Sequence, residues 1–127
     1  MRSLVIREEQ IAVLSEAAYE SFCKRLYEHI KKCWPREFER KGATGVQQSI
    51  EKGIARAAKY GIQAERDVVR YIDTMHLVGE DFDVDPKKGW VHVILEAKTL
   101  APTIKAIRIW EQAKKEHLPD KPKKVTR

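Results

Sequence analysis

Apolar residues recur three and four positions apart along most of this chain, the spacing of one face of an α-helix. The first such stretch predicts a helix from about Glu8 to Lys32. Its expected buried stripe is Ile11, Leu14, Ala18, Phe22, Leu26, Ile30 and Cys33. Trp34 and Pro35 are expected to end this helix, because proline disfavours a helical conformation in the residue before it.

Two further helices are predicted in the middle of the chain. After a polar link that contains Gly42, Thr44 and Gln47 have the spacing of a capping box, which indicates a helix start. This second helix is expected to stop at Gly61 and to bury Val46, Ile50, Ile54 and Ala57. A third helix is expected from about Ala64 to Val78, with Val68, Val69, Ile72, Met75 and Leu77 on its apolar face and Gly79 after its end.

The last two helices are each predicted from a proline at the first helical position. Asp85 and Pro86 indicate the cap and start of the fourth helix. Its expected inward residues are Trp90, Val93, Ile94 and Ala97. Pro102 indicates the start of the fifth helix, which ends before Leu118-Pro119 and is expected to bury Ile104, Ile107, Trp110 and Ala113.

The predicted fold is all-α, a compact bundle or orthogonal array of about five helices. Residues 91–95 come closest to a strand pattern, so a short strand there is the structural alternative. A length of 127 residues suits one domain. We expect a single helical domain over residues 1–118, followed by a flexible basic tail over 119–127. The sequence contains no apolar run long enough to span a bilayer and no secretory signal pattern, so we expect a cytoplasmic protein.

Charge is concentrated at the end of the chain. The net charge is +6, but residues 114–127 hold six Lys and Arg against two acidic residues, which leaves the body with only +2. The basic residues of the tail are Lys121, Lys123, Lys124 and Arg127. Basic tails bind phosphate surfaces through electrostatic attraction. A helical domain that binds nucleic acid through this tail is therefore one alternative function.

The acidic turn Asp81, Asp83 and Asp85 has the one-three-five spacing of a calcium-binding loop. Such a loop also requires glycine at its sixth position and a chelating glutamate at its twelfth. Those positions hold Pro86 and His92. We therefore expect no metal here, and instead helix caps and solvated carboxylates.

The cysteines and histidines do not form a recognisable catalytic or metal-binding motif. Cys23 and Cys33 are ten residues apart on one predicted helix, a separation of about 15 Å that forbids a disulfide between them. His29 and Cys33 lie four residues apart, but two ligands do not make a zinc site. No nucleophile elbow, HExxH or phosphate loop is present. We expect a protein that is not an enzyme and has no cofactor.

The stretch from Tyr60 to Leu95 resembles small helical proteins of Gram-negative bacteria that are often encoded beside type VI secretion spike, PAAR and toxin genes. The matching motifs cover roughly a third of the chain. They are Ile6-Arg7-Glu8-Glu9-Gln10, Tyr60-Gly61-Ile62, Glu65-Arg66-Asp67-Val68, Arg70-Tyr71, Gly79-Glu80-Asp81-Phe82-Asp83-Val84-Asp85-Pro86, Trp90 and Ile94-Leu95. The resemblance implies a non-enzymatic adaptor or chaperone that binds another protein, a secreted toxin or spike component. An immunity protein that neutralises a cognate toxin is the alternative.

Charged residues of the same stretch are the candidate partner contacts. They are Glu65, Arg66, Arg70, Asp81 and Asp83. The alternative interpretation of Glu65-Arg66-Asp67 is structural, with acidic residues that complement the helix dipole and a surface arginine.

Overall fold

A computed structural model describes residues 16–117, in which all regular secondary structure is helical. The elements are α1 (Glu16–Cys33), α2 (Pro35–Lys59), α3 (Glu65–Val78), the short 3₁₀ helix η3 (Phe82–Val84), α4 (Gly89–Leu95) and α5 (Pro102–His117). The predicted all-α fold is confirmed, and residues 91–95 are helical rather than a strand. The expected first-helix start at Glu8 and the tail at 119–127 lie outside the described residues.

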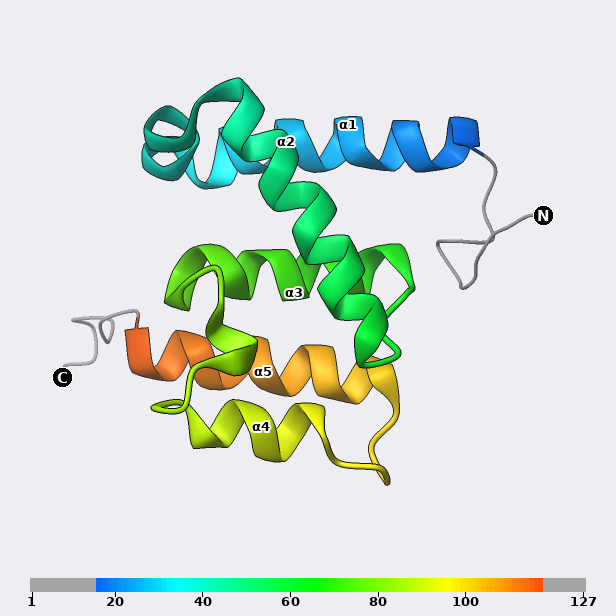
Figure 1. Cartoon of the computed structure of the whole chain (residues 1–127), viewed down its shortest axis with the longest axis vertical. Coiled ribbons are helices and arrows are strands. Elements are labelled where there is room, and N and C mark those ends of the chain that lie inside the picture. Colours follow the sequence, from blue (N-terminus) through cyan, green and yellow to red (C-terminus); the bar gives the residue numbers. More distant parts are fainter. Residues whose placement is uncertain (1–15, 118–127) are drawn as a thin grey trace, which may run out of the picture.

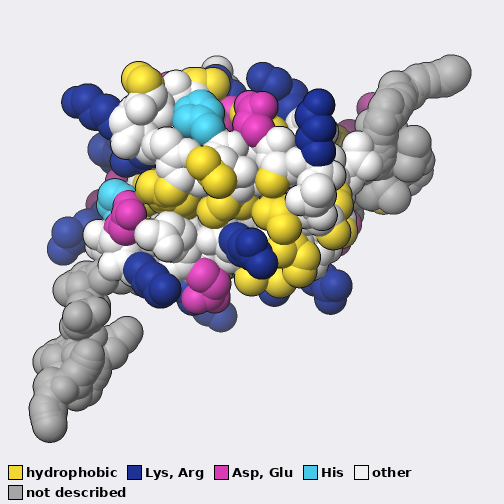
Figure 2. All heavy atoms as spheres, turned by 90° about the horizontal axis from the view of Figure 1, so that it is seen from below, with side chains coloured by type: hydrophobic (Ala, Val, Ile, Leu, Met, Phe, Trp, Pro, Cys, Tyr) yellow, Lys and Arg dark blue, Asp and Glu magenta, His cyan; other side chains and the backbone are white. Residues whose placement is uncertain are grey.

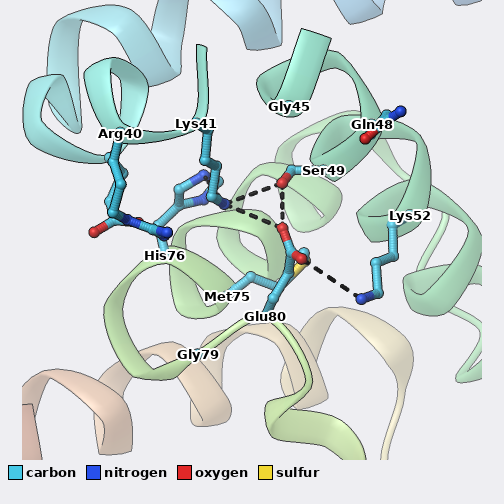
Figure 3. A pocket seen from close by; sticks show the side chains of 11 residues that line it. Arg40, Lys41, Gly45, Gln48, Ser49, Lys52, Met75, His76, Gly79 and Glu80 are labelled. Atoms are coloured by element: carbon cyan, nitrogen blue, oxygen red, sulfur yellow. Dashed lines mark hydrogen bonds and ion pairs between the residues drawn. The ribbon is translucent and has the colours of Figure 1, made fainter.

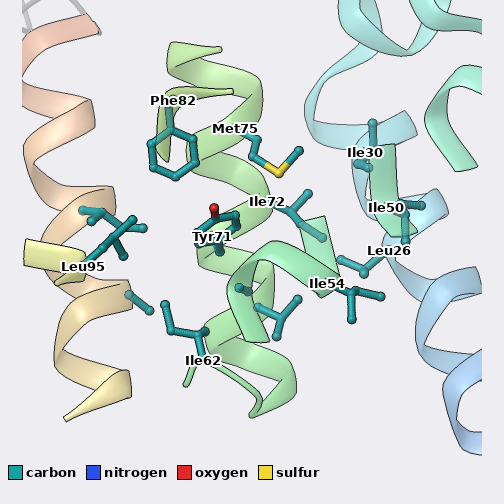
Figure 4. Packing of buried hydrophobic residues seen from close by; sticks show 14 of the residues in the cluster. Leu26, Ile30, Ile50, Ile54, Ile62, Tyr71, Ile72, Met75, Phe82 and Leu95 are labelled. Carbon is teal, nitrogen blue, oxygen red and sulfur yellow. The ribbon is translucent and has the colours of Figure 1, made fainter. Parts of the chain in front are cut away.

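The helices are stacked, with α1 at one end and α4 at the other (Figure 1). In this view α1, α3, α5 and α4 run side by side, and α2 crosses over α1 and α3 at a steep angle. Helix α3 is central, because it packs against α2 on one side and α5 on the other. Its buried Tyr71, Ile72 and Met75 join the apolar side chains of all other helices into one core (Figure 4).

The start of α2 differs from the sequence-based expectation. The chain is already helical from Pro35, directly after Trp34, so the predicted polar link is itself a helical segment. A kink at Gly42, with φ of 74°, separates this segment from the rest of α2. Glycine adopts positive φ without the steric penalty of a Cβ atom. The segment before the kink turns back against α1, where Phe38 packs edge-to-face on Tyr27 at 5.2 Å between ring centroids.

The predicted stop at Gly61 is confirmed. Gly61 has φ of 81° and its N–H donates to the Ala58 carbonyl at 3.0 Å, while the Ile62 N–H donates to Ala57 O at 3.0 Å. These two hydrogen bonds form a Schellman motif, which satisfies carbonyls that the helix end leaves unpaired. Ile62 is fully buried, so the stop also directs the chain back into the core.

Two predictions about α4, its start at Pro86 and its cap at Asp85, are wrong. The helix begins at Gly89 rather than Pro86, and no side chain caps it. Instead, the Asp85 carboxylate accepts a hydrogen bond from the Lys87 N–H at 2.9 Å, which makes a local turn. Val91 and Leu95 are the buried residues of α4, whereas Val93 is 72% exposed.

The buried face of α5 is also different from the predicted one. Its core residues are Ala106, Ile109 and Ala113, while Ile104 is 37% exposed. Ile107 and Trp110 are half-buried. The helix therefore buries two small alanines and one isoleucine, and leaves its larger apolar side chains half-buried or exposed. Small residues at a helix contact allow the two backbones to approach closely.

Candidate functional site

An apolar band on α4 and α5 faces solvent. We define the outer apolar face as Trp90, Val93, Ile94, Ala97, Ile104, Ile107 and Trp110, all of which are exposed or half-buried. Figure 2 views the molecule from the α4 side and shows hydrophobic side chains gathered across the middle, with many Lys and Arg and fewer Asp and Glu around and among them. Residues 87–117 carry seven Lys and Arg against three Glu. The face is therefore apolar in the middle and basic at its rim.

A second surface lies between α1 and α2 and has the opposite charge. We call it the acidic groove, a cavity of about 700 Å³ with Tyr19, Cys23 and Tyr27 along one wall. Its charged lining is Glu16, Glu20, Glu28 and Glu51 against Lys24. Burial and the neighbouring Cys23 and Glu51 raise the pKa of Tyr19 to about 12. The groove thus combines neutral aromatic side chains with a negative rim.

These two surfaces are at different ends of the stack. The acidic groove is lined by α1 and α2, whereas the outer apolar face belongs to α4 and α5, with α3 between the two pairs (Figure 1). One molecule therefore offers two chemically distinct surfaces, one suited to acidic and one to basic partner segments.

A third concave site, the polar pocket, lies between α2 and α3 and has a volume of about 680 Å³ (Figure 3). Its central group is the Lys41 ammonium. This group donates hydrogen bonds to Ser49 Oγ at 3.0 Å, Glu80 Oε2 at 3.1 Å and His76 Nε2 at 3.3 Å. The Ser49 hydroxyl in turn donates to the Glu80 carboxylate, which also pairs with Lys52 at 3.5 Å.

A serine beside a lysine is a pair that some hydrolases use, with a neutral lysine amine as the base for the serine. Here Lys41 directs donors to three acceptors, as an ammonium does. The Ser49 hydroxyl lines the pocket and donates its hydrogen bond to the Glu80 carboxylate. Although burial opposes it, hydrogen bonds from Ser49 and Lys41 hold the pKa of the Glu80 carboxyl below its ordinary value. These contacts therefore join α2 to the residue that follows α3 and Gly79.

His76 in this pocket makes stability depend on pH. Its Nδ1–H donates to Ile72 O at 2.9 Å, its ring stacks on Trp34, and burial lowers its pKa from the ordinary 6.5. A lowered folded-state pKa gives stability that is fully present above pH 6.5 and is lost as pH falls through the folded value. We expect the free energy of unfolding in urea to fall between pH 6.5 and 5 in the wild type.

The matched variant for this prediction is His76→Gln, which keeps a polar side chain but does not titrate. Its free energy of unfolding should be nearly constant over the same interval. The carboxylates with lowered pKa, such as Glu80, contribute only at lower pH, because their ordinary value is 4.5. Equal pH slopes for the wild type and His76→Gln would contradict the assignment.

Two of the predicted partner contacts are paired within the described structure near the start of α3. Glu65 accepts two hydrogen bonds from the Arg25 guanidinium at 2.9 and 3.2 Å, and these hold the pKa of its carboxyl below the ordinary value. Arg70 donates to Asp67 Oδ1 at 3.0 Å. Arg66 is exposed.

Asp67 has a role that the sequence did not reveal. Its side chain is buried, and its second oxygen accepts a hydrogen bond from Thr103 Oγ1 of α5 at 2.6 Å. The acidic residue that was expected only to complement the helix dipole is therefore a buried link between α3 and α5. The sequence shows only that Asp67 lies in the first turn of one predicted helix and that Thr103 follows Pro102 at the start of another. Neither position by itself predicts that the two side chains are in contact.

The acidic turn is also different from the expected set of solvated carboxylates. Asp81 is exposed and pairs with Lys52 and Arg56, both at 2.9 Å. Asp83 is buried, and it accepts hydrogen bonds from Arg56 Nη1 at 2.8 Å and from Tyr60 Oη at 2.9 Å. Burial and this contact raise the pKa of Tyr60 to about 12. The turn is thus tied to α2 by charge.

Over the described helices, no group of three or more His, Cys, Asp and Glu side chains is arranged to hold a metal ion. Within the same residues, none of the helices has the length and apolar character needed to cross a membrane. Comparison of the sequence with protein-family models, curated proteins and solved structures finds no match.

Proposed function

We propose that this chain is a non-enzymatic adaptor or chaperone that binds a type VI secretion toxin or spike protein. The observation that carries the proposal is the outer apolar face. Val93 at 72% exposure, Val84 at 53% and Ile104 at 37% are the exposed large hydrophobic residues among those described, and two of them belong to this face. Contiguous apolar surface with a polar rim is typical of protein interaction sites.

The helices that form this face are apolar on two sides. Val91 and Leu95 of α4 are buried in the core, Val93 is exposed, and Trp90 and Ile94 are half-buried and pack against the core from the side. A helix that is apolar all round is normally covered on all sides. Removing apolar surface from water contributes about 25 cal/mol per Å², so a partner that covers this face gains a substantial driving force.

Charge complementarity indicates which partners fit the two surfaces. The basic rim of the outer apolar face favours an amphipathic segment with acidic flanks. The acidic groove favours a basic segment whose apolar residues contact Tyr19, Cys23 and Tyr27. An adaptor must hold two proteins at once, and separate surfaces of opposite charge suit that task.

The secretion context comes from the resemblance of residues 60–95 to proteins encoded beside spike, PAAR and toxin genes. An immunity protein shares this genomic context, but it needs only one surface that covers its toxin. Two separate docking surfaces therefore support the adaptor over the immunity protein.

The test is a pull-down with the products of the adjacent genes, with binding measured by calorimetry. The double variant Val93→Glu, Ile104→Glu places two carboxylates on the outer apolar face. It should weaken the partner bound there by about 30-fold or more. Ala55→Glu, Ala58→Glu is the matched control, because both alanines are exposed on α2 and the change in charge is the same.

The groove has its own variant, Glu20→Lys, Glu51→Lys. This change should weaken a second partner by about tenfold at low salt and by less at high salt, because screening reduces surface electrostatics. Each double variant should spare the partner of the other surface. Failure of both variants to weaken any adjacent gene product would refute the proposal. Rescue of cells that produce the toxin would instead identify an immunity protein.

A further inference from the structure

We propose that Cys33 is a reactive thiol site that forms mixed disulfides, with His29 as its base and Asp73 as the group that positions His29. Cys33 is the last residue of α1 and is exposed. Its Sγ lies 3.7 Å from His29 Nδ1, within the range of a sulfur hydrogen bond. His29 Nε2 lies 2.8 Å from Asp73 Oδ1 of α3. These three residues form a continuous thiol–imidazole–carboxylate chain.

The carboxylate determines which imidazole nitrogen faces the thiol. An ionised carboxylate only accepts hydrogen bonds, so His29 Nε2 carries the proton and its N–H donates a hydrogen bond to Asp73. In the neutral ring, Nδ1 then has a free lone pair directed at Cys33. This is the tautomer that a base for the thiol requires, and the same logic underlies cysteine–histidine pairs in general.

Asp73 is itself held in place. Its Oδ1 also accepts a hydrogen bond from Trp34 Nε1 at 2.8 Å. The side chain of Asp73 is only 15% exposed, and that of His29 is 29% exposed, while the sulfur is at the surface. The base and its positioning group are therefore sheltered, and the nucleophile is accessible.

The accessible electrophile that this geometry suits is a disulfide. Neither the polar pocket nor the acidic groove includes Cys33, and exchange with a disulfide requires access to sulfur more than a deep substrate pocket. His29 Nδ1 takes the thiol proton, and the Cys33 sulfur bonds to one sulfur of the disulfide. The old S–S bond breaks, and the leaving thiolate takes the proton back from His29. Cys33 is oxidised to a mixed disulfide and the disulfide is reduced to one free thiol.

The second cysteine cannot release this product. Cys23 is ten residues earlier on α1, about 15 Å away along the helix, which is too far for a disulfide with Cys33. It is also half-buried, and burial is the main cause that raises its pKa. The mixed disulfide therefore persists until an external thiol removes it, so the site acts as a reversible attachment point rather than as a dithiol redox pair.

The test measures the rate at which the aromatic disulfide DTNB reacts with single-cysteine proteins at pH 7. In a Cys23→Ser background, Cys33 should react about tenfold faster than in Cys23→Ser, His29→Gln. Asp73→Asn should give an intermediate rate. Lys32→Gln, which removes an exposed neighbouring cation without removing the base, should change the rate less than twofold.

Two controls make the result decisive. In 6 M urea the folded arrangement is lost. The Cys23→Ser protein and its His29→Gln and Asp73→Asn variants should then all react with DTNB at the same rate. With glutathione disulfide as the reagent, mass spectrometry of the wild type should find the adduct on Cys33 and not on Cys23. Equal native rates with and without His29, in proteins whose circular dichroism shows them folded, would overturn the proposal.

Discussion

Asp83→Ala is expected to lower the free energy of unfolding by about 3 kcal/mol. The Asp83 carboxylate is fully buried and bonded to Arg56 and Tyr60 of α2. Removal of one member of a buried ion pair costs about 3–5 kcal/mol, because the remaining charge loses its partner. The lower end applies, since the Arg56 side chain is 26% exposed and keeps Asp81. Urea denaturation at pH 7 measures the change.

The matched control for this prediction is Asp81→Ala, two residues away. Asp81 binds the same arginine, but its side chain is 62% exposed. Exposed ion pairs contribute about 0–1 kcal/mol, so Asp81→Ala should change stability by less than about 1 kcal/mol. If both substitutions lower the free energy of unfolding by the same amount, burial does not explain the contribution of Asp83.

The Asp83 network also bears on the proposed binding surface. Asp83 lies in η3, between α3 and α4. Its two partners are Arg56, in the last turn of α2, and Tyr60, the residue directly after α2. This contact anchors the segment that leads into α4. Asp83→Ala should therefore weaken binding at the outer apolar face as well, whereas Asp81→Ala should leave it nearly unchanged.

Gly53→Ala is expected to destabilise the protein by about 2 kcal/mol, although alanine is the better helix former. A Cβ atom at Gly53 would lie 2.7 Å from Ile72 Cγ1 and 2.9 Å from Met75 Sδ. These contacts are far inside van der Waals separation, at the point where α2 crosses α3. Overpacking of this kind costs about 1–3 kcal/mol, and the gain in helix propensity offsets up to about 1 kcal/mol of it.

The control for Gly53→Ala is the same substitution at Gly89. Gly89 is the first residue of α4, and a Cβ atom there would have no atom within 4 Å. Thermal and urea denaturation should show a change of less than about 1 kcal/mol for Gly89→Ala. A Gly53→Ala protein as stable as the wild type would mean that α2 and α3 separate readily to accept the methyl group.

Several elements of the fold follow from local sequence. Pro35 restricts the residue before it, and α1 ends at Cys33 as expected. Gly61 adopts the positive φ that terminates α2. In α1, Phe22, Leu26 and Ile30 are buried as their four-residue spacing predicts, whereas Cys33, which was expected in the same stripe, is exposed at the end of the helix. These features depend on backbone sterics and on one clear apolar face, both of which are encoded within a few residues.

The orientation of α4 and α5 was not determined locally. In α4, the spacing of Trp90, Val93 and Ile94 is as consistent with a buried face as that of Val91 and Leu95. In α5, the apolar residues also form two alternative faces, one with Ile104 and Ile107 and the other with Ala106, Ile109 and Ala113. Periodicity cannot choose between two apolar faces of one helix. The choice follows from packing, because the small alanines of α5 fit closely against α3. The same packing leaves Val93 and Ile104 exposed and the other large apolar side chains of α4 and α5 half-buried, and so creates the outer apolar face.

The sequence by itself determined the all-α class, most helix ends and the burial of Phe22, Leu26 and Ile30 in α1, because these depend on neighbours in the chain. Only the tertiary structure decided which charges are buried and which side chains share a site. Asp83 meets Arg56 across 27 residues, Asp67 meets Thr103 across 36, and Asp73 meets His29 across 44. Such contacts arise from the crossing and stacking of whole helices. The four-residue spacing on α1 already places His29 beside Cys33, but no local pattern shows that the Asp73 carboxylate of α3 lies next to His29.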